Sequence, residues 1–196
     1  MITNIRYLSI VLVAELLVAA CQGDDLMTGC AKSPATNGFF VVVTGGYGPA
    51  NPKLGYTPTV KEPIIPSFHT TGSNTIRGFI MGAHKDFCRI KLEDAKGRQI
   101  AKTDLGSKYG ENYDGTYNLK ESRDLRRIYI VAGDLSQYLR EESAAWVMPS
   151  TKDLFKVRKP GTYKLTMEFK FYLQVSTNRE VVRLPPVEWQ VEAYEE

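Results

Sequence analysis

The residues that could carry chemistry in this chain are few: two histidines, three cysteines and one tyrosine-rich segment. His84 precedes Cys88 by four positions, a spacing that would need a second pair of ligands to complete a zinc site. On a strand, residues four apart lie roughly 13 Å apart, too far to chelate one ion. We therefore expect no metal site and no cofactor. Periplasmic metal trafficking through His84 is a function class that stays open.

The motifs that build common active sites are missing from the sequence. It has no G-x-S-x-G nucleophile elbow, no H-E-x-x-H pair and no phosphate-binding glycine loop. The glycine-rich stretch 45–49 ends in Pro49, which is typical of a turn. The carboxylates are scattered in a way that is typical of a solvated surface. We expect no catalytic residue and a protein that is not an enzyme.

The first twenty residues have the layout of a secretory signal peptide. Arg6 precedes a run over 10–20 that is apolar except for Glu15 and ends in the small residues Ala19 and Ala20. This run is too short to cross a hydrocarbon core about 30 Å thick as a helix. We expect residues 1–20 to be removed and the rest of the chain to be exported.

The residues Val18-Ala19-Ala20-Cys21 resemble the lipobox of bacterial lipoproteins, in which the cysteine is acylated and becomes the mature N-terminus. The resemblance implies a lipid on Cys21 and a firm membrane anchor, because each buried CH₂ contributes about 0.8 kcal/mol. Gln22 rather than Asp follows, which implies a place in the cell envelope, at the outer membrane or in the periplasm. Plain secretion with an unmodified Cys21 is the alternative.

The other two cysteines allow two arrangements. Cys88 shares one face of an expected strand with Ile90 and Leu92, so it should point inward. Cys30 stands in a polar segment, and an exported protein could join it to Cys88 by a disulfide. Alternatively, Cys88 is buried without a bond to Cys30. The sequence leaves both arrangements open.

The segment 108–118 is the candidate binding loop. It carries Tyr109, Tyr113 and Tyr117 among glycines and asparagine, the composition of recognition loops. We expect either a contact with a protein or glycan partner or, as the plainer alternative, tyrosines that fold back onto the domain.

Alternating hydrophobicity predicts an all-β protein. The clearest strands are 163–173 and 187–193, and their alternation predicts one buried and one solvated face for each. If these strands pair, Lys164 and Lys170 can face glutamates of the other strand, with a turn at 176–180 between them. Shorter strands are expected at 39–43, 75–82, 86–93 and 98–103, and one helix at 134–145, capped by Asp134.

The run 153–163, with Pro160-Gly161 two residues before Tyr163, resembles the tyrosine corner of immunoglobulin-like domains. With the closing Leu184-Pro185-Pro186-Val187 strand, the chain is similar to uncharacterised exported bacterial proteins with one such sandwich. The resemblance implies an antiparallel immunoglobulin-like β-sandwich and no defined activity. We expect a signal peptide at 1–20, a polar tether at 21–38 and a single domain at 39–196, with an irregular or helical insertion around 104–152.

The overall composition excludes several classes of protein. With 43% hydrophobic and 24% charged residues and a net charge of +3, the chain is not of a disordered or multi-span membrane type, and we expect no nucleic-acid partner. The leading expectation is a non-enzymatic, lipid-anchored protein with an interaction or structural role in the envelope. The alternative is a carbohydrate-binding module or an envelope-associated hydrolase.

Overall fold

The computed structural model describes residues 30–45, 57–74, 76–81, 86–115, 125–132, 147–175 and 178–195. Strands dominate these residues, and the two helices are single turns. The strands are β1 (Cys30–Lys32), β2 (Phe39–Thr44), β3 (Pro63–Thr70), β4 (Ile76–Met81), β5 (Cys88–Asp94), β6 (Leu125–Ala132), β7 (Met148–Ser150), β8 (Gly161–Val175), β9 (Asn178–Arg183) and β10 (Val187–Ala193). The helices are α2 (Asp104–Ser107) and α3 (Thr151–Leu154).

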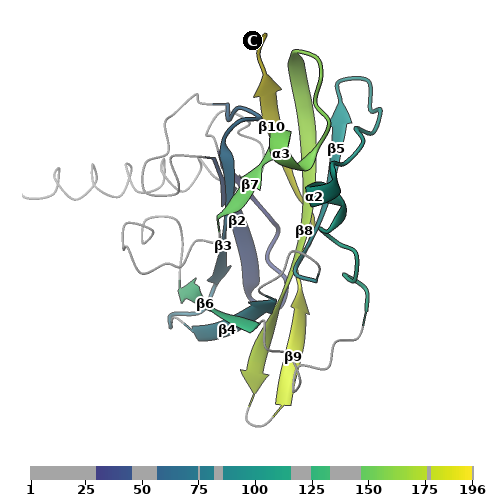
Figure 1. Cartoon of the computed structure of the whole chain (residues 1–196). Helices are drawn as coiled ribbons and strands as arrows, with labels where there is room; N and C mark the ends of the chain where they lie inside the picture. Colours follow the sequence, from purple (N-terminus) through teal and green to yellow (C-terminus); the bar gives the residue numbers. More distant parts are fainter. Residues whose placement is uncertain are drawn as a thin grey trace, which may run out of the picture.

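The strands form two packed layers, so the predicted all-β sandwich is confirmed (Figure 1). In one layer, β1, β2 and β3 pair antiparallel, and β7 adds to the start of β3. In the other layer, β8 lies at the centre. Strands β5 and β10 flank its first part, and β4 and β9 flank its last part. The length of β8 thus lets one strand hold two pairs of neighbours.

Strand β6 connects the two layers by hydrogen bonds. It pairs in parallel with the end of β3, where His69 lies opposite Val131, and antiparallel with β4, where Ile76 lies opposite Ile130. This strand falls inside the segment 104–152 that was expected to be an insertion. That expectation is wrong for residues 125–132, because β6 is an integral strand of the sandwich. The expected helix at 134–145 lies outside the described residues.

Aromatic rings fill the space between the layers. The Phe68 ring of β3 meets Phe169 and Phe171 of β8 edge-on, with ring centroids 5.9 and 5.5 Å apart. Edge-to-face pairs add about 0.5–1.5 kcal/mol to the burial of the rings themselves. Phe39 of β2 meets Phe171 in the same way at 5.4 Å. These contacts fix how the two layers face one another.

The predicted pairing of the two C-terminal strands is confirmed. Strand β10 runs antiparallel to β8 with Trp189 opposite Leu165, and Lys164 forms an ion pair of 3.2 Å with Glu188. The chain between them does more than turn, because β9 first returns along the far part of β8. Lys170 does not face a glutamate: it is only 1% exposed. The predicted wet face of β8 is therefore covered at this position.

Two further boundaries differ from the expectation. Residues 98–103 form no continuous strand: Gln99 and Lys102 make only isolated bridges, to Glu93 and Phe155. Residues 30–32 were expected to belong to a tether, yet they form β1 and pair with β2. A three-residue edge strand has too little alternation to be recognised from sequence.

Candidate functional site

An open groove of about 460 Å³ lies at the end of the sandwich where β10 finishes and β8 begins. The segment before β3 closes one side of it by pairing in parallel with β10. The Val60 amide donates to the Glu192 carbonyl at 2.8 Å, and the Glu192 amide donates to the Pro58 carbonyl at 2.9 Å. The groove is lined by Thr59, Val60, Lys61, Lys152, Val157, Arg158, Lys159, Pro160, Glu192, Ala193, Tyr194 and Glu195.

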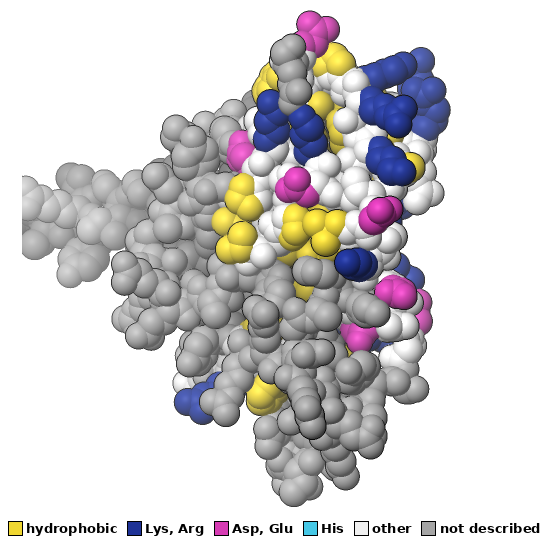
Figure 2. Space-filling model, in the orientation of Figure 1, with side chains coloured by type: hydrophobic (Ala, Val, Ile, Leu, Met, Phe, Trp, Pro, Cys, Tyr) yellow, Lys and Arg dark blue, Asp and Glu magenta, His cyan; other side chains and the backbone are white. Residues whose placement is uncertain are grey.

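Four cations give this groove its character, and we call it the basic groove: Lys61, Lys152, Arg158 and Lys159, all exposed. Two carboxylates, Glu192 and Glu195, also line it, so the cations are in excess. Figure 2 shows Lys and Arg side chains gathered at the upper end of the face that carries α3. A concave surface with excess positive charge concentrates anions.

The backbone that carries these cations is held by hydrogen bonds. In α3, the Ser150 and Asp153 side chains form a capping box, which engages the Asp153 carboxylate next to Lys152. The Lys152 amide donates to the Val60 carbonyl at 2.8 Å, which fastens α3 to the far wall of the groove. The groove is therefore built on a fixed frame.

The tyrosine corner holds the remaining wall. The Tyr163 hydroxyl donates to the Lys159 carbonyl at 2.7 Å, as the sequence predicts. This bond fixes the backbone of the loop from Arg158 to Pro160 while the side chains of Arg158 and Lys159 stay in solvent. A motif that the sequence suggested for fold alone thus also positions two cations of the groove.

Tyr194 adds an exposed ring to the groove. Its side chain is 65% exposed, which is rare for a large aromatic residue. Its hydroxyl donates a hydrogen bond to the Glu192 carboxylate, and this bond raises the pKa of Tyr194. The groove therefore combines positive charge with an apolar ring, a combination that binds anions and flat polar rings.

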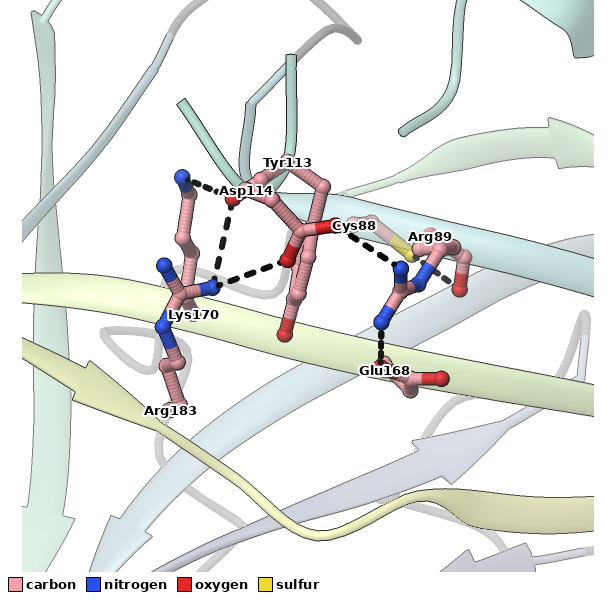
Figure 3. A network of polar contacts seen from close by, with 7 residues as sticks. All are labelled: Cys88, Arg89, Tyr113, Asp114, Glu168, Lys170 and Arg183. Carbon is pink, nitrogen blue, oxygen red and sulfur yellow. Dashed lines mark hydrogen bonds and ion pairs between the residues drawn. The ribbon is translucent and has the colours of Figure 1, made fainter. Parts of the chain in front are cut away.

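Residues 108–115, which we call the Tyr113 strap, cover part of the outer face of the layer that contains β8. A second polar cluster lies beneath this strap (Figure 3). The Lys170 ammonium donates to the Tyr113 carbonyl at 2.6 Å, and Arg183 donates to the same carbonyl at 3.2 Å. The Asp114 carboxylate pairs with Arg89 at 3.0 Å and with Arg183 at 3.7 Å. The strap therefore joins β5, β8 and β9.

The ring of Tyr113 is surrounded by the same three cations. The charged groups of Arg89, Lys170 and Arg183 lie 4.8, 5.2 and 5.3 Å from its centroid. Burial raises the pKa of Tyr113 to about 12, and it lowers the pKa of Lys170. Covering by the strap explains why Lys170 breaks the alternation of β8. These contacts hold the strap against the sheet, which is a structural role.

Two of the three tyrosines predicted to bind a partner, Tyr109 and Tyr113, lie among the described residues, and both are buried. Tyr109 is 1% exposed, with its ring 6.4 Å from that of Phe87, and Tyr113 is 3% exposed. They lie as the packing alternative expects, and in this conformation they offer no exposed contact area. Partner binding by the loop stays a prediction, since Tyr117 lies outside the described residues, as does Cys21.

Of the two arrangements that the sequence left open, the disulfide between Cys30 and Cys88 is not formed in the structure. Cys88 is a free thiol, so it is not bonded to Cys30. The physical reason is location: Cys88 packs in the main core, whereas Cys30 packs against Phe40 and Val42 in a separate cluster. Burial raises the pKa of the Cys88 thiol well above its usual range. It is therefore an inert core residue.

Sequence reasoning missed the basic groove. Within 152–159 the chain carries Lys152, Lys156, Arg158 and Lys159 against the single acid Asp153. This density was a usable signal, although the run was interpreted for its resemblance to a tyrosine corner. Lys61 and Tyr194 could not be assigned to the groove from sequence, because they meet the run only through the pairing of residues 58–60 with β10.

The lining of the groove is mainly cationic, with one exposed aromatic ring. Among the described residues that line it, there is no histidine, cysteine or serine to act as base or nucleophile. No three described His, Cys, Asp or Glu residues are grouped to hold a metal ion, and no described helix is long and apolar enough to cross a membrane. A comparison with known proteins finds no family model, curated protein or solved structure that matches this chain.

Proposed function

We propose that this chain is an exported, lipid-anchored, non-enzymatic protein that acts in the cell envelope by binding an anionic partner in the basic groove. The observation that carries the proposal is the groove itself: four exposed cations on a hydrogen-bonded frame around about 460 Å³. The signal-like residues 1–20 and the lipobox-like Val18–Cys21 support export and acylation.

A binding role also agrees with the placement of the reactive side chains. Cys88 is sealed in the core, and His69 is buried in β3 with its Nε2 3.0 Å from the Ser67 hydroxyl. Neither reaches the groove, whose chemistry is cationic and aromatic. Anion recognition by Lys and Arg needs no titratable base and no activated nucleophile.

The test is cross-linking in the intact envelope followed by mass spectrometry of the peptides that bear the adducts. We expect adducts on groove peptides, and we expect them to be strongly reduced when Arg158→Gln and Lys159→Gln remove two groove charges. The matched control is Arg77→Gln with Lys91→Gln, which removes two exposed charges outside both the groove and the segment 108–118. Equal adducts in the two double variants would contradict binding through the groove. The same spectra report whether Cys21 carries lipid.

A carbohydrate-binding role is the second candidate, because Tyr194 presents an exposed ring beside the groove cations. An aromatic face can stack on a sugar ring while Lys and Arg contact acidic substituents. A glycan array distinguishes the two roles. Glycan binding that is lost in Tyr194→Ala would favour this candidate, and hydrolysis of cell-wall polymers would contradict a non-enzymatic role.

A further inference from the structure

The basic groove lies at the end of the sandwich where the chain enters from its N-terminal side. Cys30 of β1 pairs with Thr44, and Thr44 pairs with Ile65 near the start of β3. The next residue, Gly45, lies so close to Glu62 and Pro58 that an added Cβ would stand 2.8 Å from the Glu62 carboxylate. Pro58 in turn accepts the hydrogen bond from Glu192 of the groove. Cys30 and the groove therefore share one end of the domain.

The length of chain before Cys30 keeps this end near the anchor. This step rests on the proposed function, which places a lipid on Cys21. The nine residues from Gln22 to Cys30 reach at most about 30 Å when fully extended. The end of the domain that carries the basic groove is thus the end that the tether holds beside the bilayer.

The positive charges at this end of the domain suit contact with an anionic bilayer surface. Besides the four groove cations, Lys156 is exposed just after α3, and Lys96 is exposed in the turn after β5. That turn belongs to the same end, because Asp94 pairs with Tyr163 at the start of β8. Cations within a Debye length of an anionic headgroup layer are attracted to it. Basic residues that the tether holds beside the bilayer therefore favour contact between the domain and anionic headgroups.

Tyr194 is the second feature that suits a headgroup layer. Tyrosine is enriched at membrane interfaces, where its ring sits at headgroup level and its hydroxyl stays in water. Here the ring is 65% exposed on the rim of the groove. A soluble anion would explain the cations alone. A bilayer explains the cations, the exposed ring and their position at the tethered end.

We propose that the anionic partner of the basic groove is the phospholipid surface that holds the anchor: the groove end docks on anionic headgroups, with lipid phosphates beside Lys61, Lys152, Arg158 and Lys159. The domain then lies against the bilayer in a fixed orientation. The β4–β9 end, at the opposite end of β8, faces away from the membrane (Figure 1).

The test measures lysine accessibility in the processed, full-length mature protein bound to vesicles. Its intact mass is determined first. The protein is then mixed with vesicles of phosphatidylcholine, with or without phosphatidylglycerol, and acetylated by a water-soluble reagent. We expect Lys152 and Lys159 to react several-fold more slowly when phosphatidylglycerol is present, and to recover in high salt. Lys108, exposed beyond α2, is the internal control and should react equally in both.

Each contrary outcome has a distinct meaning. Equal labelling of Lys152 and Lys159 in both vesicles, or protection that high salt does not reverse, would overturn the docking. So would equal protection by inorganic phosphate with phosphatidylcholine vesicles, because that would reveal a small-anion site. If the mass shows no lipid on Cys21, the anchor fails, and the docking is then decided by sedimentation of the unlipidated protein with vesicles. Sedimentation with anionic vesicles but not with phosphatidylcholine vesicles, lost in Arg158→Gln with Lys159→Gln, would support the docking. No sedimentation with anionic vesicles would overturn the docking.

Discussion

At the scale of single residues, Tyr113 shows how one side chain can organise a surface. Its carbonyl accepts from Lys170 and Arg183, and its ring lies among three cations. Asp114 beside it is 74% exposed, so its ion pairs are screened by water. The buried ring and carbonyl of Tyr113, rather than the exposed ion pairs of Asp114, should therefore hold the strap in place.

Replacement of Tyr113 tests whether its buried ring and carbonyl hold the strap more strongly than the ion pairs of Asp114 do. We expect Tyr113→Ala to lower the free energy of unfolding by about 3 kcal/mol, since it empties a site that is 3% exposed. Tyr113→Phe keeps the ring and should be nearly neutral. Asp114→Asn removes the exposed ion pairs and should cost less than about 1 kcal/mol. Urea unfolding measures all three. A larger loss in Asp114→Asn than in Tyr113→Ala would show that the ion pairs dominate.

The buried titratable groups predict how stability depends on pH. Burial raises the pKa of Cys88 and of Tyr109, and it raises that of Tyr113 to about 12. In the unfolded chain these groups ionise at about 8.5 for cysteine and about 10 for tyrosine. Because the unfolded chain releases its protons first, their contribution is fully present below about pH 8.5 and falls as the pH rises toward 12.

Urea midpoints measured between about pH 7 and about pH 11 check this expectation. The Cys88 contribution should begin to fall near the ordinary cysteine pKa, and the lowered pKa of Lys170 offsets part of this fall up to about pH 10.4, because the unfolded chain there holds the lysine proton longer. The tyrosines should make the fall steeper above about pH 10. In Cys88→Ala the first part of the fall should vanish, so that the onset moves to about pH 10. An unchanged onset in that variant would exclude Cys88 as its source.

At the scale of elements, α2 and α3 depend on a close approach at Gly106. A Cβ added there would lie 1.9 Å from the Leu154 carbonyl oxygen of α3. Because that atom belongs to the backbone, it cannot move aside cheaply. Gly106 is therefore required by packing, although alanine is the better helix former by about 1 kcal/mol.

We expect Gly106→Ala to destabilise the domain by at least about 2 kcal/mol, because one of the two helices must shift. Gly115→Ala is the matched control, since its nearest neighbour would lie 3.4 Å away, an ordinary contact. Thermal unfolding of the two variants measures the difference. If Gly106→Ala melts together with Gly115→Ala, the two helices do not pack as tightly as the structure has them.

The elements that could be predicted from sequence are those with local patterns. The alternation of β8 and β10 is complete within each strand, and their pairing followed from it. Strand β6 was missed although Ile128 and Ile130 alternate into the core, because its partners β3 and β4 are far away in sequence. Lys170 was placed on the wet face because no local pattern shows that a distant strap covers it. The groove likewise joins segments that only the fold brings together.

At the scale of the whole molecule, the continuous path of paired strands predicts how the sandwich unfolds. Strand β6 bonds to β3 of one layer and to β4 of the other, and the rings of Phe68, Phe169 and Phe171 interlock between the layers. Neither layer can lose its partner without exposing apolar surface that the other buries. The described domain should therefore unfold in one cooperative transition, with amides of β2 and β8 exchanging at the same free energy of opening.

Ile130 of β6 is the residue that tests this coupling. It is fully buried, so Ile130→Ala should cost about 2–5 kcal/mol. If β6 unites the layers, hydrogen exchange in the variant should speed up equally for amides of β2 and of β8, although these strands belong to different layers. Val181→Ala on β9 is the control, because Val181 is 49% exposed and its loss should leave both strands unchanged. Faster exchange confined to one layer would show that the two layers open independently, with the rings between them too weak to couple them.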